Sequence, residues 1–374
     1  MKILMVLSNP FILDFRVYSE AKTLIEKGHQ VTILAWNKKN LDIPKQEVKE
    51  KIQVVRSLNT RFMKTLPYDI FRMHQWWKKG YKDALNLHKK YDYDIIHCHD
   101  LDTLPLGVRL KKKTDLPLIY DAHEFWADMV AQDIPKTWSD YYRRIERKII
   151  VNVDSIITVN EPLKEYLRRI TDKKITIVMN CKPLQMKKYK PTDNDRFTLL
   201  YIGALLRCRY IVELIDVVKE ISDIKCIIGG KGKPDFFQMI KNKSSEVSNI
   251  DFIGQVPMKK VIPMTIESDA VVCMTDPSDP NSSRALANKQ FEAMVSARPI
   301  ICTKNTYPGI FTEKYNVGIT TDYDKESLKK AILKLKNNKD LSEKLGRNAL
   351  DMALKEFNWG IQKKKLVRLY EEIK

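Results

Sequence analysis

The feature that most constrains this chain is a repeated alternation of short, β-rich apolar runs with stretches whose apolar residues recur at helical spacing. It begins with KILMVL at residues 2–7, continues through a helical stretch that stops at Gly28, and returns to an apolar run at VTILAW. A strand that starts so soon after a helix stops has the compact spacing of a βαβ unit. The sequence therefore predicts a parallel sheet with helical crossovers.

The same alternation starts again at FTLLYIGALL, from residue 197, and continues to VGITT. The segment between the two halves is polar and basic, has two prolines and shows no apolar periodicity, which is typical of a linker. A chain of 374 residues is also too long for one ordinary core. We therefore predict an α/β fold of two doubly wound Rossmann-like domains that face each other across a cleft. The predicted bounds are 1–182, a linker 183–196, a second domain 197–356 and a final amphipathic helix in 357–374.

Composition narrows the setting of the protein. No apolar stretch reaches the roughly 18 to 20 residues that cross a bilayer, and we interpret the N-terminal apolar run as a first strand instead of a signal peptide. The six cysteines are scattered and form no C-x-x-C pair. We therefore expect a reducing, cytoplasmic setting and no structural zinc.

The net charge of +19 favours anionic partners. Within residues 51–90, ten lysines and arginines stand against two acidic residues, and Trp76 and Trp77 lie among them. Such a segment can rest on the anionic face of a membrane, so a peripheral position on its inner face is one expectation. The alternative is a solvated helix face with aromatic residues in the core. No recognised nucleic-acid module is present, and we predict no nucleic-acid partner.

Residues at the ends of strands are the first candidates for a site, because ligands bind at the carboxyl ends of strands in open α/β sheets. In the N-terminal half, Asp121, His123 and Glu124 follow the run LPLIY. An imidazole there can hydrogen-bond a substrate hydroxyl while a carboxylate orients the ring. The alternative is a strand-end histidine that backbone groups satisfy.

Two Asp-x-Asp pairs have a pattern that can hold a divalent cation. Asp92 and Asp94 precede their strand, which is the wrong end of a doubly wound sheet, so we reject a metal there. Asp100 and Asp102 follow the next strand and, with its two histidines at positions 97 and 99, can line a binding cleft. We expect no bound metal.

In the C-terminal half, Gly203 ends an apolar run, and Arg207 and Arg209 lie in the turn that leads to a helix. A helix N-terminus with guanidinium groups nearby can bind a diphosphate. The run GGKG around Gly230 and Lys231 resembles a phosphate loop, but it lacks the spacing of the known phosphate motifs. A tight turn without ligand is the preferred interpretation of those glycines.

A last cluster lies in NKQFEAMVSARPII, where Asn288, Lys289 and Glu292 fall on a predicted helix between two strands. Asn288 and Glu292 share a face. A glutamate there can accept hydrogen bonds from both hydroxyls of a ribose, while the lysine meets a phosphate. The alternative is an ordinary surface helix with a charged face.

Taken together and in order, these segments resemble the retaining glycosyltransferases of family 4, which have the GT-B fold, over nearly the whole chain. Asp14 and Arg16 ahead of Gly28 and His29 are similar to the family's opening segment. The same holds, farther along, for YDAHE, VNEPLKEYL, YIGALL, GGKG and NKQFEAMVSARPII. The segment after Trp359 resembles the helix that crosses back to the N-terminal domain in this fold.

The resemblance implies transfer of a sugar, with retention and without a metal or cofactor, from a UDP-, GDP- or ADP-sugar to a glycan or lipid-linked acceptor. The implied catalytic residues are His123, Arg209 and Lys231. The implied donor-binding residues are Gly203, Arg207, Gly230, Asn288, Lys289 and Glu292. The implied acceptor-side residues are Arg16, His99, Asp100, Asp121 and Glu124.

One departure from the family pattern keeps other functions open. The family often has a glutamate eight positions before Glu292, and this chain has Arg284 there. A non-catalytic or partner-dependent sugar-nucleotide-binding protein is therefore one alternative, and a nucleotide-sugar epimerase of similar fold is another. A nicotinamide oxidoreductase is disfavoured, because neither half contains the dinucleotide glycine fingerprint.

Overall fold

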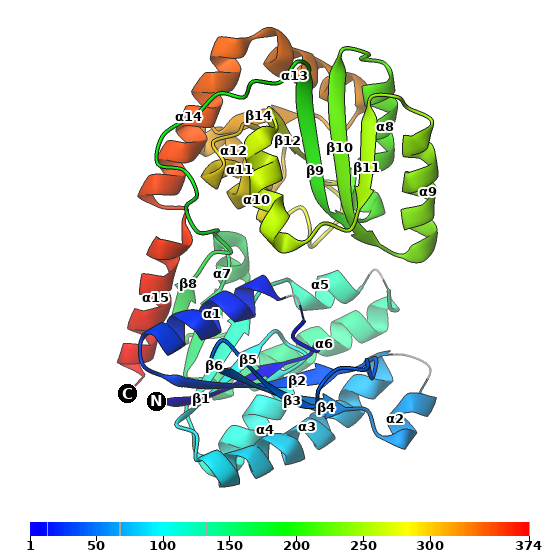
Figure 1. Cartoon of the computed structure of the whole chain (residues 1–374). Coiled ribbons are helices and arrows are strands. Elements are labelled where there is room, and N and C mark those ends of the chain that lie inside the picture. Colours follow the sequence, from blue (N-terminus) through cyan, green and yellow to red (C-terminus); the bar gives the residue numbers. More distant parts are fainter. Residues whose placement is uncertain (13, 67–68, 132, 374) are drawn as a thin grey trace. The chain divides into compact units, whose positions relative to one another are not determined.

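A computed structural model describes residues 1–12, 14–66, 69–131 and 133–373. The chain divides into two units (Figure 1). The first comprises Met1–Met179 and Lys363–Lys374, and the second comprises Asn180–Gln362. Within the described residues, no helix is both long and apolar enough to cross a membrane.

The first unit is built on an eight-stranded sheet with the order β3-β4-β2-β1-β5-β6-β7-β8. Only the β3–β4 pair is antiparallel among the strand pairs of the described part of this unit. Its strands are β1 (Lys2–Leu7), β2 (Gln30–Asn37), β3 (Gln46–Lys49), β4 (Ile52–Leu58), β5 (Ile95–His99), β6 (Leu118–Ala122), β7 (Ser155–Thr158) and β8 (Ile175–Ile177). The predicted parallel sheet is confirmed, and the β3–β4 hairpin is an addition that the sequence analysis missed.

Helices cover both faces of this sheet, with α1 on one face and α3 and α4 on the other (Figure 1). The bounds are α1 (Phe15–Glu26), α2 (Arg61–Thr65), α3 (Asp69–Tyr91), α4 (Leu104–Thr114), α5 (Trp126–Val130), α6 (Lys136–Ile149), the 3₁₀ turn η1 (Ile150–Asn152) and α7 (Glu161–Arg168). Helix α1 has clear local signals, because the Asp14 side chain accepts from the Val17 N–H at its start and Gly28 follows its end with φ +83°.

The second unit has a six-stranded parallel sheet with the order β11-β10-β9-β12-β13-β14. Its strands are β9 (Phe197–Leu205), β10 (Ile224–Gly232), β11 (Ile250–Gly254), β12 (Ala270–Cys273), β13 (Ile300–Thr303) and β14 (Gly318–Thr321). Its helices are the 3₁₀ turn η2 (Arg207–Arg209), α8 (Ile211–Lys219), α9 (Pro234–Ser245), α10 (Met258–Glu267), α11 (Asn288–Val295), α12 (Tyr307–Tyr315), α13 (Lys325–Asn337) and α14 (Lys339–Lys355). The final helix, α15 (Trp359–Glu372), begins in this unit, and its residues from Lys363 onward belong to the first.

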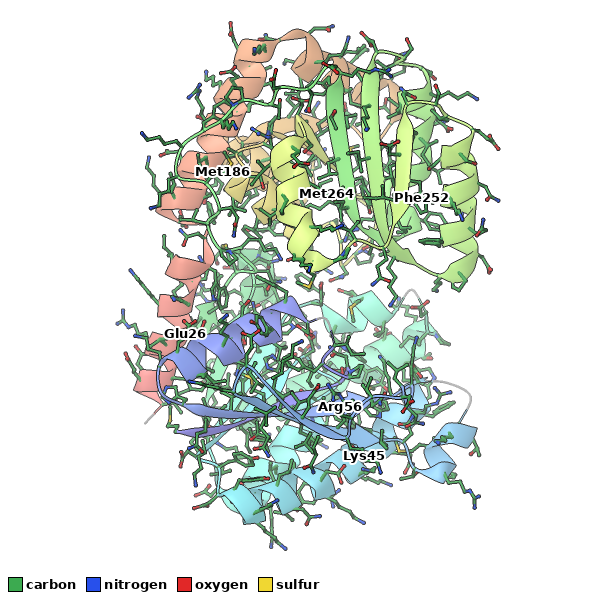
Figure 2. All side chains as sticks on the ribbon, in the orientation of Figure 1. Glu26, Lys45, Arg56, Met186, Phe252 and Met264 are labelled. Carbon is green, nitrogen blue, oxygen red and sulfur yellow. The ribbon has the colours of Figure 1, made fainter. Side chains whose placement is uncertain are left out.

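Each unit has its own hydrophobic core, and side chains fill the space between each sheet and its helices (Figure 2). In the first core, Trp76 of α3 is fully buried and stacks on Trp36 of β2 with ring centroids 5.0 Å apart. Trp76 therefore belongs to the core, as the alternative interpretation of segment 51–90 expected.

The prediction of a glycine turn at GGKG is wrong, because these residues extend strand β10. Gly230 pairs in register with Gly203 of β9, which itself continues to Leu205. A Cβ on Gly230 would lie 1.8 Å from the Gly203 carbonyl oxygen, and Gly230 has φ +153°. The glycine at 230 is thus required by the close approach of two strands.

Candidate functional site

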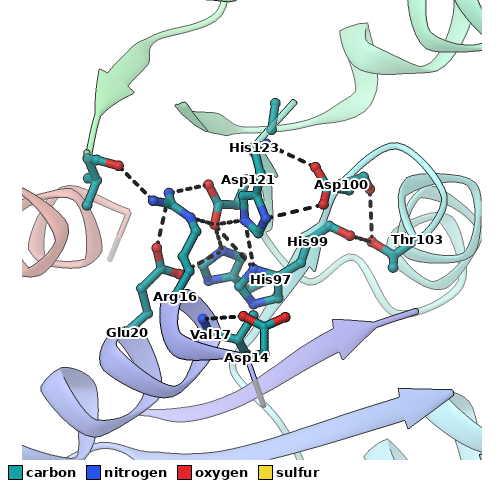
Figure 3. Close-up of polar contacts among 12 residues, drawn as sticks. Asp14, Arg16, Val17, Glu20, His97, His99, Asp100, Thr103, Asp121 and His123 are labelled. Carbon is teal, nitrogen blue, oxygen red and sulfur yellow. Dashed lines mark hydrogen bonds and ion pairs between the residues drawn. The ribbon is translucent and has the colours of Figure 1, made fainter. Parts of the chain in front are cut away.

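The strand order of the first unit reverses between β1 and β5, and the residues just beyond these strands form a polar cluster (Figure 3). Such reversal points are where open α/β sheets bind ligands. His99 at the end of β5 pairs in register with Asp121 of β6. Asp100 and His123 follow the same two strands, so the sheet brings together four residues that the sequence analysis selected.

Asp121 is the centre of this cluster. Arg16 of α1 donates from Nη2 to Asp121 Oδ1 over 2.6 Å and from Nε to Oδ2 over 3.0 Å, and its third nitrogen donates to the Val178 carbonyl oxygen over 2.7 Å. Burial by itself would raise the pKa of Asp121, but Arg16 and His123 outweigh it and hold that pKa well below its usual value. Asp121 is therefore a buried carboxylate that stays ionised.

His123 is clamped between two carboxylates. Its Nε2 lies 2.6 Å from Asp121 Oδ2, its Nδ1 lies 3.2 Å from Asp100 Oδ2, and its backbone N–H donates to Asp100 Oδ1. Burial alone would lower the pKa of His123, but the two carboxylates reverse this and hold the pKa well above its ordinary value. The ring is consequently an imidazolium near neutral pH, fixed in orientation and 14% exposed.

The roles expected of Arg16, His99 and Asp121 change, because all three are buried and cannot contact an acceptor directly in this arrangement. His99 Nδ1 lies 3.2 Å from Asp121 Oδ2, so the His99 ring helps to hold the carboxylate in place. Asp100 and Glu124 are only partly buried, and of the acceptor-side residues they keep access to a ligand. The buried residues act by holding His123.

Two further buried members complete this cluster: Glu20, which the sequence analysis missed, and His97, which it expected to line a binding cleft. Glu20 lies one turn after Arg16 on the face of α1 that also carries buried apolar residues, and a charged residue in such a stripe was the available signal. His97 precedes His99 by two positions on β5, and its Nδ1 lies 2.7 Å from the hydroxyl of Tyr370 on α15. The terminal helix is thereby anchored to the cluster.

Glu20, His97, His99 and Asp121 have the composition of a metal site, and one ligand atom from each lies within 4.8 Å of the others. However, the Arg16 guanidinium contacts both carboxylates, at 2.6 Å from Asp121 and 3.1 Å from Glu20. A fixed side-chain cation therefore already contacts both acids and compensates the ionised Asp121.

Glu20 makes the stability of the first unit depend on pH. Burial raises its pKa from 4.5 to about 8, so the folded state keeps a proton that the unfolded state releases above pH 4.5. The free energy of unfolding should fall as pH rises through this window, and the Glu20→Gln variant should lack that part of the slope. Urea unfolding of both proteins at several pH values between 4.5 and 8 measures the difference. Parallel pH curves for the two proteins would contradict the assignment.

In the second unit the strand order reverses between β9 and β12, and a cationic cluster lies beyond these strands. Arg209 ends η2 and donates from Nη1 to Thr275 Oγ1, just past β12, over 2.9 Å. The ammonium of Lys289, on α11, lies 4.3 Å from the Tyr201 ring centroid, and a Cβ on Gly203 would lie 2.3 Å from it. Gly203 therefore leaves the space that this ammonium occupies.

Burial lowers the pKa of Lys289, and the Arg209 guanidinium nearby acts in the same direction. Helix α11 starts at Asn288 without a side-chain cap, so its first N–H groups add to the positive potential. A concentrated positive potential at a helix N-terminus suits a diphosphate.

Glu292 lies on α11, one turn after Asn288, and is 14% exposed. The sequence analysis missed its partner, Lys182. The Lys182 ammonium lies 3.6 Å from Glu292 Oε1 and 3.1 Å from Asn288 Oδ1, and the residue is buried. Lys182 stands at the end of the predicted first domain, and its charge was the only local signal. The cluster thus joins one acid to three cations.

Two further candidates lie apart from these contacts. The Arg207 guanidinium lies over the Phe236 ring of α9, 5.3 Å from its centroid. Lys231 is exposed on β10, in register with Ala204. Of the cations selected in this half, Arg209 and Lys289 are the ones that meet at the strand ends.

Two protein-family models match consecutive segments of the chain. Glycosyltransferase Family 4 matches residues 15–182, and Glycosyl transferases group 1 matches residues 184–352. The alpha-monoglucosyldiacylglycerol synthase of Streptococcus pneumoniae is 23% identical over 315 residues, which cover 76% of this chain and 66% of that protein. The matches agree with the resemblance seen in the sequence.

Solved structures share the fold. Sucrose-phosphate synthase from Thermosynechococcus elongatus has a TM-score of 0.80 at 18% identity and covers 100% of this chain and 99% of its own. Anabaena Alr3699/HepE in complex with UDP and glucose has a TM-score of 0.73 at 14% identity, with 100% of both chains covered. The predicted GT-B fold is confirmed by these likenesses.

Proposed function

Since the chain belongs to glycosyltransferase family 4 and is a glycosyltransferase, we propose that it transfers the sugar of a UDP-sugar to a lipid-linked acceptor. The observation that carries this proposal is the meeting of Arg209, Lys289 and Glu292 beyond strands β9 and β12. Uridine as the base is supported by the structural neighbour that was solved with UDP. GDP- and ADP-sugars are the competing donors.

The donor contacts follow from the chemistry of each group. The Glu292 carboxylate accepts hydrogen bonds from the ribose hydroxyls, while Arg209, Lys289 and the N-terminus of α11 bind the diphosphate. As the bond between the anomeric carbon and the phosphate oxygen breaks, negative charge grows on the phosphate. Fixed cations at that position stabilise the transition state more than the ground state. Lys231, exposed on β10, makes the smaller contribution.

We propose that transfer proceeds with retention and without a metal ion. The acceptor oxygen attacks on the face that the phosphate leaves, and the leaving phosphate takes the acceptor proton, so no carboxylate nucleophile is required. Arg284 fits this scheme, because its side chain is directed to its own loop, where Nε donates to the Pro280 carbonyl oxygen. The imidazolium of His123, whose two ring N–H groups are held by Asp121 and Asp100, contributes a fixed positive charge beside the reacting hydroxyls and does not act as a base.

Binding of the donor is the direct test. Glu292→Ala should weaken UDP-sugar binding about 10- to 100-fold, because hydrogen bonds to a charged group contribute about 1.5–3 kcal/mol. Calorimetry with UDP-, GDP- and ADP-sugars, with and without a chelator, measures the effect and identifies the base. An unchanged affinity in Glu292→Ala would contradict the ribose contact. Conversion of the donor without any acceptor would instead indicate the epimerase.

A lipid-linked acceptor is supported by the surface of the first unit around α2. Arg61, Phe62 and Lys64 are exposed there, and Phe62 is 59% exposed. An apolar groove of about 610 Å³ adjoins this helix, lined by Leu66, Phe71, His74, Gln75, Thr137, Trp138 and Tyr141. The relative from Streptococcus pneumoniae is named for a diacylglycerol product. We therefore place the membrane contact on α2 and the groove.

Two residues of segment 51–90 do not serve this contact. The guanidinium of Arg56, on β4, is buried against Glu47, and Trp76 lies in the core. Pro67 and Tyr68 lie outside the described residues. The contact is therefore smaller than the charge count of the segment suggests.

The double variant Phe62→Ser/Lys64→Glu should bind vesicles of phosphatidylglycerol at least about tenfold more weakly than the wild type, because each basic residue near an anionic surface contributes about 1 kcal/mol. Co-sedimentation with these vesicles and with phosphatidylcholine vesicles measures the loss. Ile310→Ser/Lys314→Glu, on α12, removes the same side-chain types from an exposed site of the second unit and serves as the control. Equal vesicle binding by the α2 variant and the control would contradict the proposed contact on α2.

A further inference from the structure

Lys182 is a buried lysine in the loop after β8, with 5% of its surface exposed. Its ammonium bridges the first two turns of α11, because it lies 3.1 Å from Asn288 Oδ1 and 3.6 Å from Glu292 Oε1. A buried ammonium is costly unless it is paired, so these contacts are not incidental surface pairings.

The backbone at Lys182 is held in place. Its carbonyl oxygen accepts a hydrogen bond from the Trp359 N–H over 3.0 Å, and the preceding residue, Cys181, is fully buried. The side chain therefore extends from a fixed point to α11, and the position of its ammonium is set by the fold of the second unit.

From this geometry we infer that Lys182 positions Glu292 for recognition of the donor ribose. The inference rests on the function proposed above. An ammonium bound to Oε1 limits the rotation of the carboxylate before the ligand arrives, which lowers the entropic cost of binding. It leaves the second carboxylate oxygen for the ribose hydroxyls.

The same contact separates two opposite charges on α11. Lys289 lies three residues before Glu292, the spacing at which helical side chains form ion pairs. Here Glu292 pairs with Lys182, and the Lys289 ammonium lies over the Tyr201 ring of β9.

Binding of UDP and of 2′,3′-dideoxy-UDP to the full chain tests this inference. Lys182→Met should weaken UDP binding about tenfold and leave the affinity for the dideoxy compound unchanged. Glu292→Gln should show the same selectivity, and the double variant should lose no more than Glu292→Gln alone, because the two residues act as one unit. Lys182→Arg should restore part of the loss. Lys187→Met removes an exposed charge from the same segment and should bind both ligands as the wild type does.

Equal losses for both ligands, additive with Glu292→Gln, would overturn the inference and identify Lys182 as a phosphate ligand. Unchanged UDP binding in Lys182→Met, with weakened binding in Glu292→Gln, would also overturn it while leaving the proposed function intact. Absence of UDP binding by the wild type would contradict both this inference and the proposed function. If Lys182→Met does not fold, Asn288→Ala, which frees the ammonium from its other partner, should give a smaller loss with the same preference for the ribose-containing ligand.

Discussion

Replacing Arg209 by alanine should lower the rate of sugar transfer at saturating donor by about 10²–10³-fold, the effect of removing one fixed donor from a site where negative charge develops. Arg209 is tied to Thr275 beside the ends of β9 and β12, so its guanidinium is already in place before the diphosphate starts to leave. Its loss should therefore appear in kcat more than in KM. Steady-state kinetics with a UDP-sugar and a lipid acceptor measure both constants.

Two comparisons sharpen this expectation. Lys219→Ala removes an exposed positive charge from the far end of α8, and its kinetics should equal those of the wild type. The rate of Lys231→Ala should lie between those of these two variants, because Lys231 is exposed on β10 and its charge is screened by solvent. A loss in Lys231→Ala as large as that in Arg209→Ala would assign the leaving-group role to the glycine-rich strand end instead.

Replacing Asp121 by alanine should destabilise the first unit by about 3–5 kcal/mol, because it leaves the buried Arg16 guanidinium without its main partner. Asp121 is fully buried, and Arg16 is 7% exposed. Glu20 lies 3.1 Å from Arg16, but burial raises its pKa to about 8, so it compensates little of the charge near neutral pH. Urea unfolding followed by the fluorescence of the tryptophans measures the change.

A second substitution separates charge from packing. Arg16→Met combined with Asp121→Ala removes both charges and should recover most of the lost stability, since deleting a whole buried pair costs far less than deleting one partner. Glu165→Ala, which breaks an exposed pair with Arg168, should cost less than about 1 kcal/mol. If the double variant were as unstable as Asp121→Ala, packing and not charge would explain the loss.

The two clusters have a common design. In each, the ends of neighbouring parallel strands bring charged residues together at the point where the strand order reverses. The first cluster buries its charges and presents His123, whereas the second leaves Glu292 partly accessible. In each cluster, the partly exposed residue is the one that can contact a ligand, and its buried neighbours hold it in place.

Local sequence signals determined the alternation of strands and helices in both units, although not the β3–β4 hairpin. The change between two-residue and 3.6-residue periodicity located strands and helices, and Gly28 marked the end of α1, because helix termination depends on a few consecutive residues. Strand ends also pointed to His123 and Arg209, since a parallel sheet aligns all its carboxyl ends at one edge. These features need no knowledge of distant contacts.

Tertiary structure alone decided which of these residues are buried and what they contact. Trp76 is buried in the core, and the buried Arg16 contacts Asp121, which in turn contacts His123. Lys182 contacts Glu292, which lies 110 residues later in the sequence. The glycines near residue 230 lie in a strand because β9 passes close beside them. Such contacts depend on how the crossovers bring distant segments together, and a pattern that spans a few residues carries no information about that approach.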